Sequence, residues 1–225
     1  MRMRVCLFDI DGTLVGTGGA GKAAIDMALA EEFGIRESIA SGSMAGRTDR
    51  GIASNQFRRH SIDDSLENWR RLRAAYVRKL PTFLEEHAGA VLPGIVETLE
   101  LLGDAEVSLG LLTGNMLEGA RLKLTHYRLF HYFPFGVYGD EHLTRDEIAH
   151  EALRLVRQRL DPSMAPEEIV IVGDTPLDVQ CARAIGARVV AVATGSHSCD
   201  ELAATDPDLL LADLSDPAPL LSLLD

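Results

Sequence analysis

The sequence contains little of what marks several protein classes. It has three cysteines, Cys6, Cys181 and Cys199, an odd number without the spacing of a metal site. Reduced thiols in a cytoplasmic protein are the simplest account of them. No apolar run is long enough to span a bilayer. The basic start Met1–Arg4 is not followed by the apolar stretch of a signal peptide. We therefore expect a cytoplasmic protein without a membrane partner.

Positive charge is also scarce. Lys and Arg number 22 against 34 Asp and Glu, so the formal net charge is −12, which argues against a nucleic acid partner. A small local basic pocket remains compatible with this balance. The apolar and charged fractions are ordinary for a globular protein, and the length suits one sizeable domain or a domain with an insert. We expect a monomer or a homodimer.

Two apolar runs in the sequence each end in aspartates. The first leads into Asp9-Ile10-Asp11-Gly12-Thr13, and the second leads into Gly173-Asp174-Thr175-Pro176-Leu177-Asp178. Both runs predict buried parallel strands. Asp9 and Asp11 would face the same side of their strand and would repel each other unless a partner such as a divalent cation neutralises them. Asp174 and Asp178 would lie one helical turn apart. The structural alternative is that these acids are turn or helix-start residues.

The residues from Ala24 to about Ala90 have a helical pattern with no convincing strand. We expect a first helix that Gly34 ends, a second that starts at Thr48 or Asp49, and a third that starts at Asp63 or Asp64 and is broken by Pro81. Arg47, at the start of the second helix, suits an anionic ligand because free backbone N–H groups lie beside it. A solvated surface arginine is the alternative interpretation.

A glycine-rich segment precedes these helices and nearly matches a phosphate-binding P-loop. Gly16, Gly21 and Lys22 fit the motif, but Ala23 stands where a hydroxyl residue should hold magnesium. The segment also starts too late after the first predicted strand. A flexible hinge is the competing interpretation, since glycines permit unusual backbone angles.

Strands and helices alternate through the rest of the chain, which predicts a doubly wound parallel sheet. A strand over Glu106–Thr113 ends at Thr113-Gly114-Asn115, which offers a hydroxyl and backbone donors to an oxyanion. Arg145 precedes a helix expected from about Glu147 to Leu160. It either pairs with Asp146 or reaches the carboxylates. Because ligands bind beyond the carboxyl ends of such strands, the fold can gather these residues in one crevice.

These motifs, in this order, resemble the haloacid dehalogenase superfamily, most closely its phosphoglycolate-phosphatase-like branch. The resemblance implies a Rossmann-like core over residues 1–14 and 91–225, with a helical cap over residues 15–90. It implies that Asp9 attacks phosphorus and becomes an aspartyl-phosphate, and that Asp11 serves as general acid and base. It also implies that Mg²⁺ is bound by Asp9, the backbone carbonyl of Asp11 and Asp174, with Asp178 near or in the shell.

The resemblance assigns the other site residues as well. Thr113 and Asn115 would hold phosphoryl oxygens, with Gly12 and Gly114 beside the bound group. Arg145 would take the basic position, where many members have lysine; Lys123, in the middle of a helix, suits that position less well. Arg47 lies in a segment that resembles substrate-contacting cap loops and is the candidate for specificity.

The resemblance therefore implies a Mg²⁺-dependent phosphatase that acts on a small, anionic phosphorylated metabolite such as phosphoglycolate. Asp11 separates the chain from dehalogenating members, which lack this acid. A phosphomutase of the same fold is a competing hypothesis, although mutases often carry valine where Thr13 stands. Two further hypotheses are a P-loop nucleotide-binding protein and a non-enzymatic acidic interaction module with a vestigial site.

Overall fold

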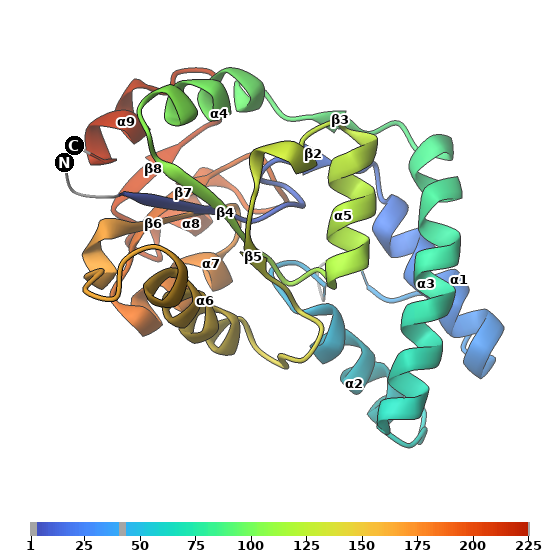
Figure 1. Ribbon diagram of the computed structural model, residues 1–225. Helices are drawn as coiled ribbons and strands as arrows, with labels where there is room; N and C mark the ends of the chain where they lie inside the picture. Colours follow the sequence, from blue (N-terminus) through green and yellow to red (C-terminus); the bar gives the residue numbers. More distant parts are fainter. Residues whose placement is uncertain (1–3, 41–43, 225) are drawn as a thin grey trace.

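The central layer of the protein is a parallel sheet. The computed structural model describes residues 4–40 and 44–224. The six strands of the central sheet run in the order β5-β4-β1-β6-β7-β8 (Figure 1). All neighbouring strands in this sheet pair in parallel, which confirms the expected Rossmann-like α/β fold. The strands are β1 Val5–Phe8, β4 Ser108–Leu112, β5 Gly136–Val137, β6 Ile169–Gly173, β7 Arg188–Val192 and β8 Leu209–Leu211.

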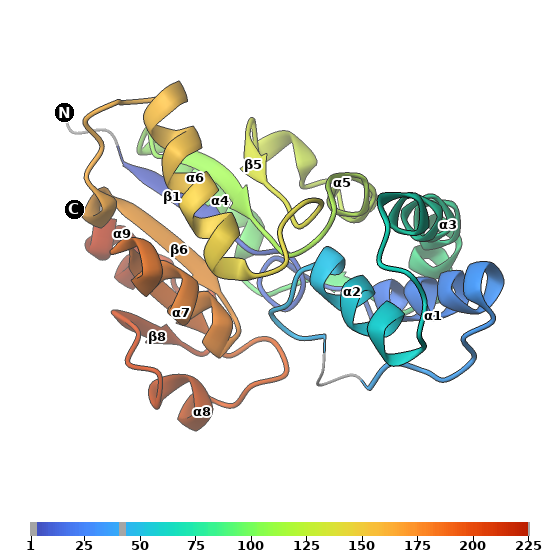
Figure 2. The ribbon, with the colours of Figure 1, turned by 90° about the horizontal axis from the view of Figure 1, so that it is seen from below.

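Helices cover both faces of the sheet, and successive side chains of β1 divide between the two faces. Cys6 and Phe8 pack in the apolar core beneath helices α4, α5 and α9, whereas Val5 and Leu7 pack beneath α6, α7 and α8. Figure 2 shows α6 and α7 side by side on one face. Because all four side chains are fully buried, β1 is apolar throughout, as expected of a central parallel strand. These helices span Ile95–Asp104 (α4), Leu117–His126 (α5), Arg145–Arg159 (α6), Pro176–Ile185 (α7), Cys199–Ala203 (α8) and Ala218–Leu224 (α9).

A second group of helices, which we call the cap, lies between two short strands. Strand β2 (Val15–Gly16) pairs antiparallel with β3 (Ala90–Val91), so the chain enters and leaves the cap through a two-stranded ribbon. The cap has its own apolar core, in which Phe57, Leu72 and Leu80 are fully buried. Its helices are α1 Ala20–Phe33, α2 Asp49–Arg59 and α3 Leu66–Glu86.

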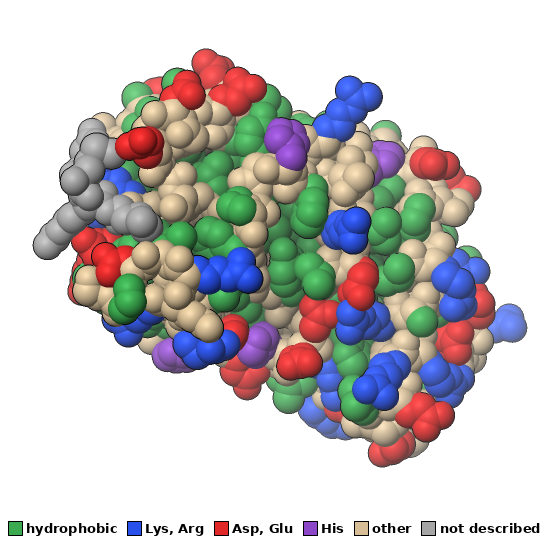
Figure 3. All heavy atoms as spheres, in the orientation of Figure 1, with side chains coloured by type: hydrophobic (Ala, Val, Ile, Leu, Met, Phe, Trp, Pro, Cys, Tyr) green, Lys and Arg blue, Asp and Glu red, His purple; other side chains and the backbone are tan. Residues whose placement is uncertain are grey.

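Charged side chains gather on the outer surface of the cap. Figure 3 shows lysine, arginine and acidic side chains interspersed over this part of the molecule. Ion pairs join α3 to α1, including Arg71 with Glu32 and Lys79 with Glu31. Positive and negative side chains are therefore interspersed on this face of the cap. None of the helices among the described residues is both long and apolar enough to cross a membrane.

Some of the helix boundaries predicted for the cap are confirmed, and others are wrong. Gly34 ends α1 and Thr48 caps α2, as expected. Helix α3 starts after Ser65, whose hydroxyl accepts from Asn68 N, rather than after Asp63 or Asp64. Pro81 does not break α3, because Leu80 and Leu84 on either side of it are buried in the cap core and hold the chain helical despite the lost hydrogen bond.

Other boundaries moved by a few residues. Helix α6 begins at Arg145, two residues earlier than expected, because Thr144 and Glu147 form a capping box. The strands β2 and β3 were not expected, since each has only two residues. Two short 3₁₀ turns, Phe130–Tyr132 and Pro166–Glu168, complete the described elements.

Candidate active site

The carboxyl ends of three adjacent strands meet at one edge of the sheet. In register, Phe8 of β1 lies between Leu111 of β4 and Val172 of β6. The residues that follow these strands therefore come together, among them Asp9, Thr113 and Asp174. Asp9 and Asp174 line a cavity of about 370 Å³, and residues of the cap line its other side.

Three buried carboxylates cluster at this edge of the sheet, and two of them, Asp9 and Asp174, line the cavity. Oxygen atoms of Asp9, Asp174 and Asp178 all lie within 4.8 Å of one another. The three residues are at most 5 % exposed. Among the described residues, Asp9 Oδ1 has no hydrogen-bond partner. Clustered carboxylate oxygens with an unsatisfied buried atom suit a hard divalent cation such as Mg²⁺, so the residues present fit the metal that the sequence implied.

Hydrogen bonds from two threonines hold two of these carboxylates in place. Thr13 Oγ1 donates to Asp174 Oδ1 at 3.0 Å, and Thr175 donates to Asp178 Oδ2 through its backbone N and its hydroxyl, at 3.0 and 2.7 Å. Asp178 thereby serves the start of α7 as a structural acid while it also faces the cluster. The structural interpretation and the functional one therefore both apply to this residue.

The backbones of two glycines pack closely against the Asp174 carboxylate. A Cβ at Gly12, where φ is +83°, would lie 2.3 Å from Asp174 Oδ2, and one at Gly195 would lie 1.7 Å from the same atom. Only glycine permits the backbone to approach the carboxylate this closely. Gly195 was not identified from the sequence, where it stands in an ordinary Thr-Gly-Ser loop.

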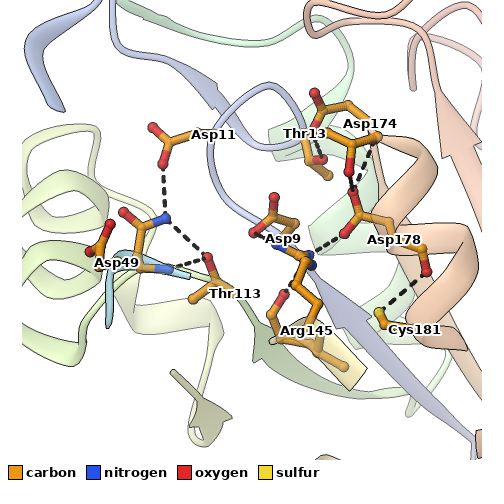
Figure 4. A network of polar contacts seen from close by, with 12 residues as sticks. Asp9, Asp11, Thr13, Asp49, Thr113, Arg145, Asp174, Asp178 and Cys181 are labelled. Carbon is orange, nitrogen blue, oxygen red and sulfur yellow. Dashed lines mark hydrogen bonds and ion pairs between the residues drawn. The ribbon is translucent and has the colours of Figure 1, made fainter. Parts of the chain in front are cut away.

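Arg145 is the cation of the carboxylate cluster. It lies between two of the acids (Figure 4), with Nη1 3.4 Å from Asp9 Oδ1 and Nη2 in an ion pair with Asp178. The side chain is only 3 % exposed. Of the two possibilities left by the sequence, the structure shows Arg145 reaching the carboxylates rather than Asp146. The Arg145 guanidinium can pair with these buried acids because it retains its positive charge when it is buried itself.

Burial dominates the proton affinity of the cluster. It raises the pKa of Asp9 to about 6, with Asp178 and Asp11 adding to the rise and Arg145 and the Thr113 hydroxyl opposing it. Burial likewise raises the pKa of Asp174 well above its ordinary value, and Asp178 and Asp9 add to that rise. Three carboxylates against one guanidinium leave an excess of negative charge, which a bound cation would relieve.

Asp11 lies apart from the cluster and has different partners. Its Oδ2 accepts from Asn115 Nδ2 at 2.8 Å and from Lys123 Nζ at 2.5 Å. The same Asn115 amide donates to Thr113 Oγ1 at 3.0 Å, and Asn115 Oδ1 accepts from Lys123 at 2.6 Å. The Asp11 side chain is 40 % exposed and faces the cavity, where it can exchange protons with a bound molecule.

Lys123 is a member of the site that the sequence does not favour. Its place within a helix makes it less suitable than Arg145 for the basic position, but its side chain is buried and its ammonium contacts Asp11. Each acid of the Asp9–Asp11 pair therefore has a buried cation beside it. A signal is present in the sequence, because Lys123 lies on the same helical stripe as buried Ala120 and Leu124, where an unpaired lysine would be costly.

The remaining predicted residues also line this cavity, with differences in exposure. Gly12, Gly114 and Asn115 lie on the core side of it, and Arg47 lies on the cap side but is exposed. A Cβ at Gly114 would meet Arg47 O at 2.1 Å, so glycine lets the cap approach this loop. The structure does not support a P-loop. Gly16 belongs to the antiparallel ribbon rather than to a loop after a parallel strand.

Comparison with known proteins identifies the family. The model of the haloacid dehalogenase-like hydrolases matches residues 6–192. The phosphoglycolate phosphatase of Salmonella typhimurium is 30 % identical over 241 residues, covering 98 % of this chain and 93 % of that protein. The phosphoglycolate phosphatase of Escherichia coli K12 is 27 % identical over 240 residues, with the same coverage.

Solved structures share the fold at lower identity. A predicted phosphoglycolate phosphatase from Haemophilus somnus has a TM-score of 0.70 at 19 % identity, covering 98 % of this chain and 99 % of that one. CbbY from Rhodobacter sphaeroides, solved in complex with phosphate, has a TM-score of 0.73 at 20 % identity, covering 96 % of each chain. The sequence match and the shared fold agree with the motif order at the strand ends. The chain belongs to the haloacid dehalogenase-like hydrolase family.

Proposed function

We propose that this hydrolase is a Mg²⁺-dependent phosphatase that acts on a small phosphomonoester through an aspartyl-phosphate at Asp9. One observation carries the proposal: the two acids of the Asp9–Asp11 pair have separate surroundings. Asp9 is buried in a carboxylate cluster with Arg145, whereas Asp11 faces the cavity beside Lys123 and Asn115. That division suits a nucleophile and a proton carrier.

The first step transfers the phosphoryl group to the protein. A carboxylate oxygen of Asp9 bonds to phosphorus while the bond from phosphorus to the ester oxygen breaks, and the departing alkoxide takes a proton from Asp11. In the second step Asp11 removes a proton from water, whose oxygen bonds to phosphorus as the bond to Asp9 breaks. Inorganic phosphate leaves, and Asp9 and Asp11 return to their starting forms.

Charge around the reacting phosphorus would be balanced from several sides. Arg145 holds Asp9 in place, and Thr113 and Asn115 offer a hydroxyl and an amide to phosphoryl oxygens. Asp9, the Asp11 carbonyl and Asp174 would hold Mg²⁺, with Asp178 near or in its shell. When bound, the ion neutralises the carboxylates and the phosphoryl oxygens, so that one anion can approach another.

The size and charge of the cavity favour a small anionic ester. The volume of about 370 Å³ is near the lower end of ligand pockets, and residues of the cap line one side of it. Arg47 and Lys22 line its cap side and place positive charge there, with Lys22 also paired to Asp26 at 2.7 Å. Relatives named as phosphoglycolate phosphatases make 2-phosphoglycolate the first substrate to test.

A screen of phosphorylated metabolites with Mg²⁺ tests this proposal. Release of inorganic phosphate is measured for the wild type, with Asp9→Asn as the blank and Asp104→Asn, an exposed aspartate at the end of α4, as the matched control. The proposal expects hydrolysis by the wild type and by Asp104→Asn but not by Asp9→Asn. A rearranged phosphosugar without phosphate release would instead indicate a mutase.

A further inference from the structure

Asp49 of the cap makes two hydrogen bonds to residues 113–116 of the core, which we call the phosphoryl-binding loop because Thr113 and Asn115 are proposed to hold phosphoryl oxygens. It is the first residue of α2 and is 9 % exposed. Its backbone N donates to Gly114 O at 2.7 Å, and its Oδ2 accepts from Met116 N at 2.8 Å. One residue of the cap therefore holds the two peptide groups that flank Asn115.

The residue that Asp49 brackets is central to the site. Asn115 is 7 % exposed, and its amide is shared between Asp11 and Thr113. A shift of the backbone at Gly114 or Met116 would turn this amide away from both partners. Within the core, Lys123 also donates to Asn115 Oδ1. The backbone on either side of Asn115, however, is held by a contact that exists only while the cap lies against the core.

The start of helix α5 shows why this contact is needed. Met116 precedes the helix and supplies no side-chain cap, so the first N–H groups need outside acceptors. Met116 N donates to Asp49 of the cap, and Leu117 N donates to Asp140 Oδ2 of the core at 2.7 Å. Two successive amides are thus satisfied by carboxylates from different parts of the molecule, one from the cap and one from the core.

Further contacts seat the cap at the same place. Arg50 N donates to Gly139 O at 3.3 Å, and Thr48 Oγ1 donates to Leu143 O at 3.2 Å. Gly114 leaves room for the cap backbone, since a Cβ there would meet Arg47 O at 2.1 Å. The start of α2 is therefore the part of the cap that presses on the phosphoryl-binding loop.

We propose that Asp49 is a positioning residue that couples the seating of the cap to the orientation of Asn115. The inference rests on the proposed phosphatase activity for its kinetic consequence, but the structural coupling can be measured without any activity. With the cap seated, Asp49 completes the start of α5 and holds Asn115 toward Asp11 and Thr113. With the cap displaced, Met116 N loses its acceptor, and the Asn115 amide is held less firmly because Lys123 is then its remaining side-chain anchor.

Amide exchange in D₂O, followed by NMR, tests the coupling directly. Asp49→Ala should speed exchange at the Met116 amide at least tenfold and leave the Leu117 amide within about threefold. Asp140→Ala is the matched control and should give the reverse pattern, although it also removes an ion pair with Arg73. Equal exchange at Met116 in the wild type and in Asp49→Ala would overturn the proposal.

Kinetics separates positioning from other roles of the carboxylate. With 2-phosphoglycolate and Mg²⁺, Asp49→Ala should lower kcat about 10- to 100-fold with KM changed less than threefold. Asp49→Asn, whose amide oxygen can still accept from Met116 N, should recover kcat to within about threefold of the wild type. An equal loss in both variants would show that the charge matters rather than the hydrogen bond, and would overturn the proposal.

Two further outcomes are informative. If Asp49→Ala raised KM alone and left Met116 exchange unchanged, Asp49 would be a substrate contact and the proposal would be wrong. If the wild type hydrolysed no phosphate ester, the proposed function would fail while the exchange pattern would still decide the coupling. Arg73→Ala, which breaks two other ion pairs between the cap and the core, to Glu118 and Asp140, should leave Met116 exchange within threefold of the wild type.

Discussion

Removal of Arg145 should destabilise the metal-free protein strongly, and Mg²⁺ should reverse part of the loss. The Arg145→Met variant keeps an unbranched apolar stem, shorter than that of arginine, and leaves Asp9, Asp174 and Asp178 without their buried cation. Loss of one partner from a buried ion pair costs about 3–5 kcal/mol. For a chain of this size that corresponds to a fall in Tm of roughly 6–20 °C.

The assay is thermal unfolding in EDTA and again with excess Mg²⁺. In EDTA the variant should show the full loss of Tm. Addition of Mg²⁺ should raise its Tm by more than it raises that of the wild type, because the ion then supplies charge to acids that have no other cation. Mg²⁺ at 100 times its Kd adds about 2.7 kcal/mol to the free energy of unfolding of a protein with one such site, so the rescue is measurable.

Control variants make the result specific to the cluster. Arg154→Met removes an arginine from the same helix, where it pairs with Glu151 at the surface, and should leave Tm nearly unchanged. Arg145→Lys keeps the charge but not the fork that reaches Asp9 and Asp178, so it should lose less than Arg145→Met. An unchanged Tm for Arg145→Met in EDTA, or a Mg²⁺ gain no larger than that of the wild type, would refute the reasoning.

Three other outcomes follow from the site. Lys123→Met should lower kcat by about 10² to 10³, because Asp11 and Asn115 lose the cation that holds both, as phosphate-release kinetics can show. Gly195→Ala should raise the Mg²⁺ concentration for half-maximal activity about tenfold, since its Cβ displaces Asp174, whereas Gly103→Ala, with open space around it, should not. The metal-free protein should lose stability as the pH rises from 3.8 to about 6, because folded Asp9 retains a proton that the unfolded chain releases. Since Mg²⁺ binds the deprotonated acids, its Tm gain should grow through the same range; a gain independent of pH would contradict the assignment of Asp9 as a ligand.

The core of the site could be predicted from the sequence because local patterns determine it. Asp9 and Asp174 each end an apolar strand, and parallel strands bring their carboxyl ends to one edge. Thr113 was found by the same reasoning. These residues needed no knowledge of which helices pack together.

Lys123, Gly195 and Asp49 needed that knowledge. Lys123 reaches Asp11 only because α5 packs beside β1 with this face inward. Gly195 matters because its loop passes Asp174, and Asp49 because the cap presses its helix start on the Thr113–Met116 loop. The prediction at Pro81 is wrong for a related reason: local propensity favours a break, but burial on both sides of it keeps α3 helical.

Chemical trapping of the intermediate tests the central claim most directly. The protein is mixed with Mg²⁺ and a substrate found in the metabolite screen, quenched during turnover, and treated with borohydride, which reduces an acyl phosphate to an alcohol. Peptide mass analysis should then find homoserine at position 9 in the wild type and unmodified residue in Asp9→Asn. A wild type that hydrolyses the substrate with no modification at Asp9, or with modification at another carboxylate, would contradict the account.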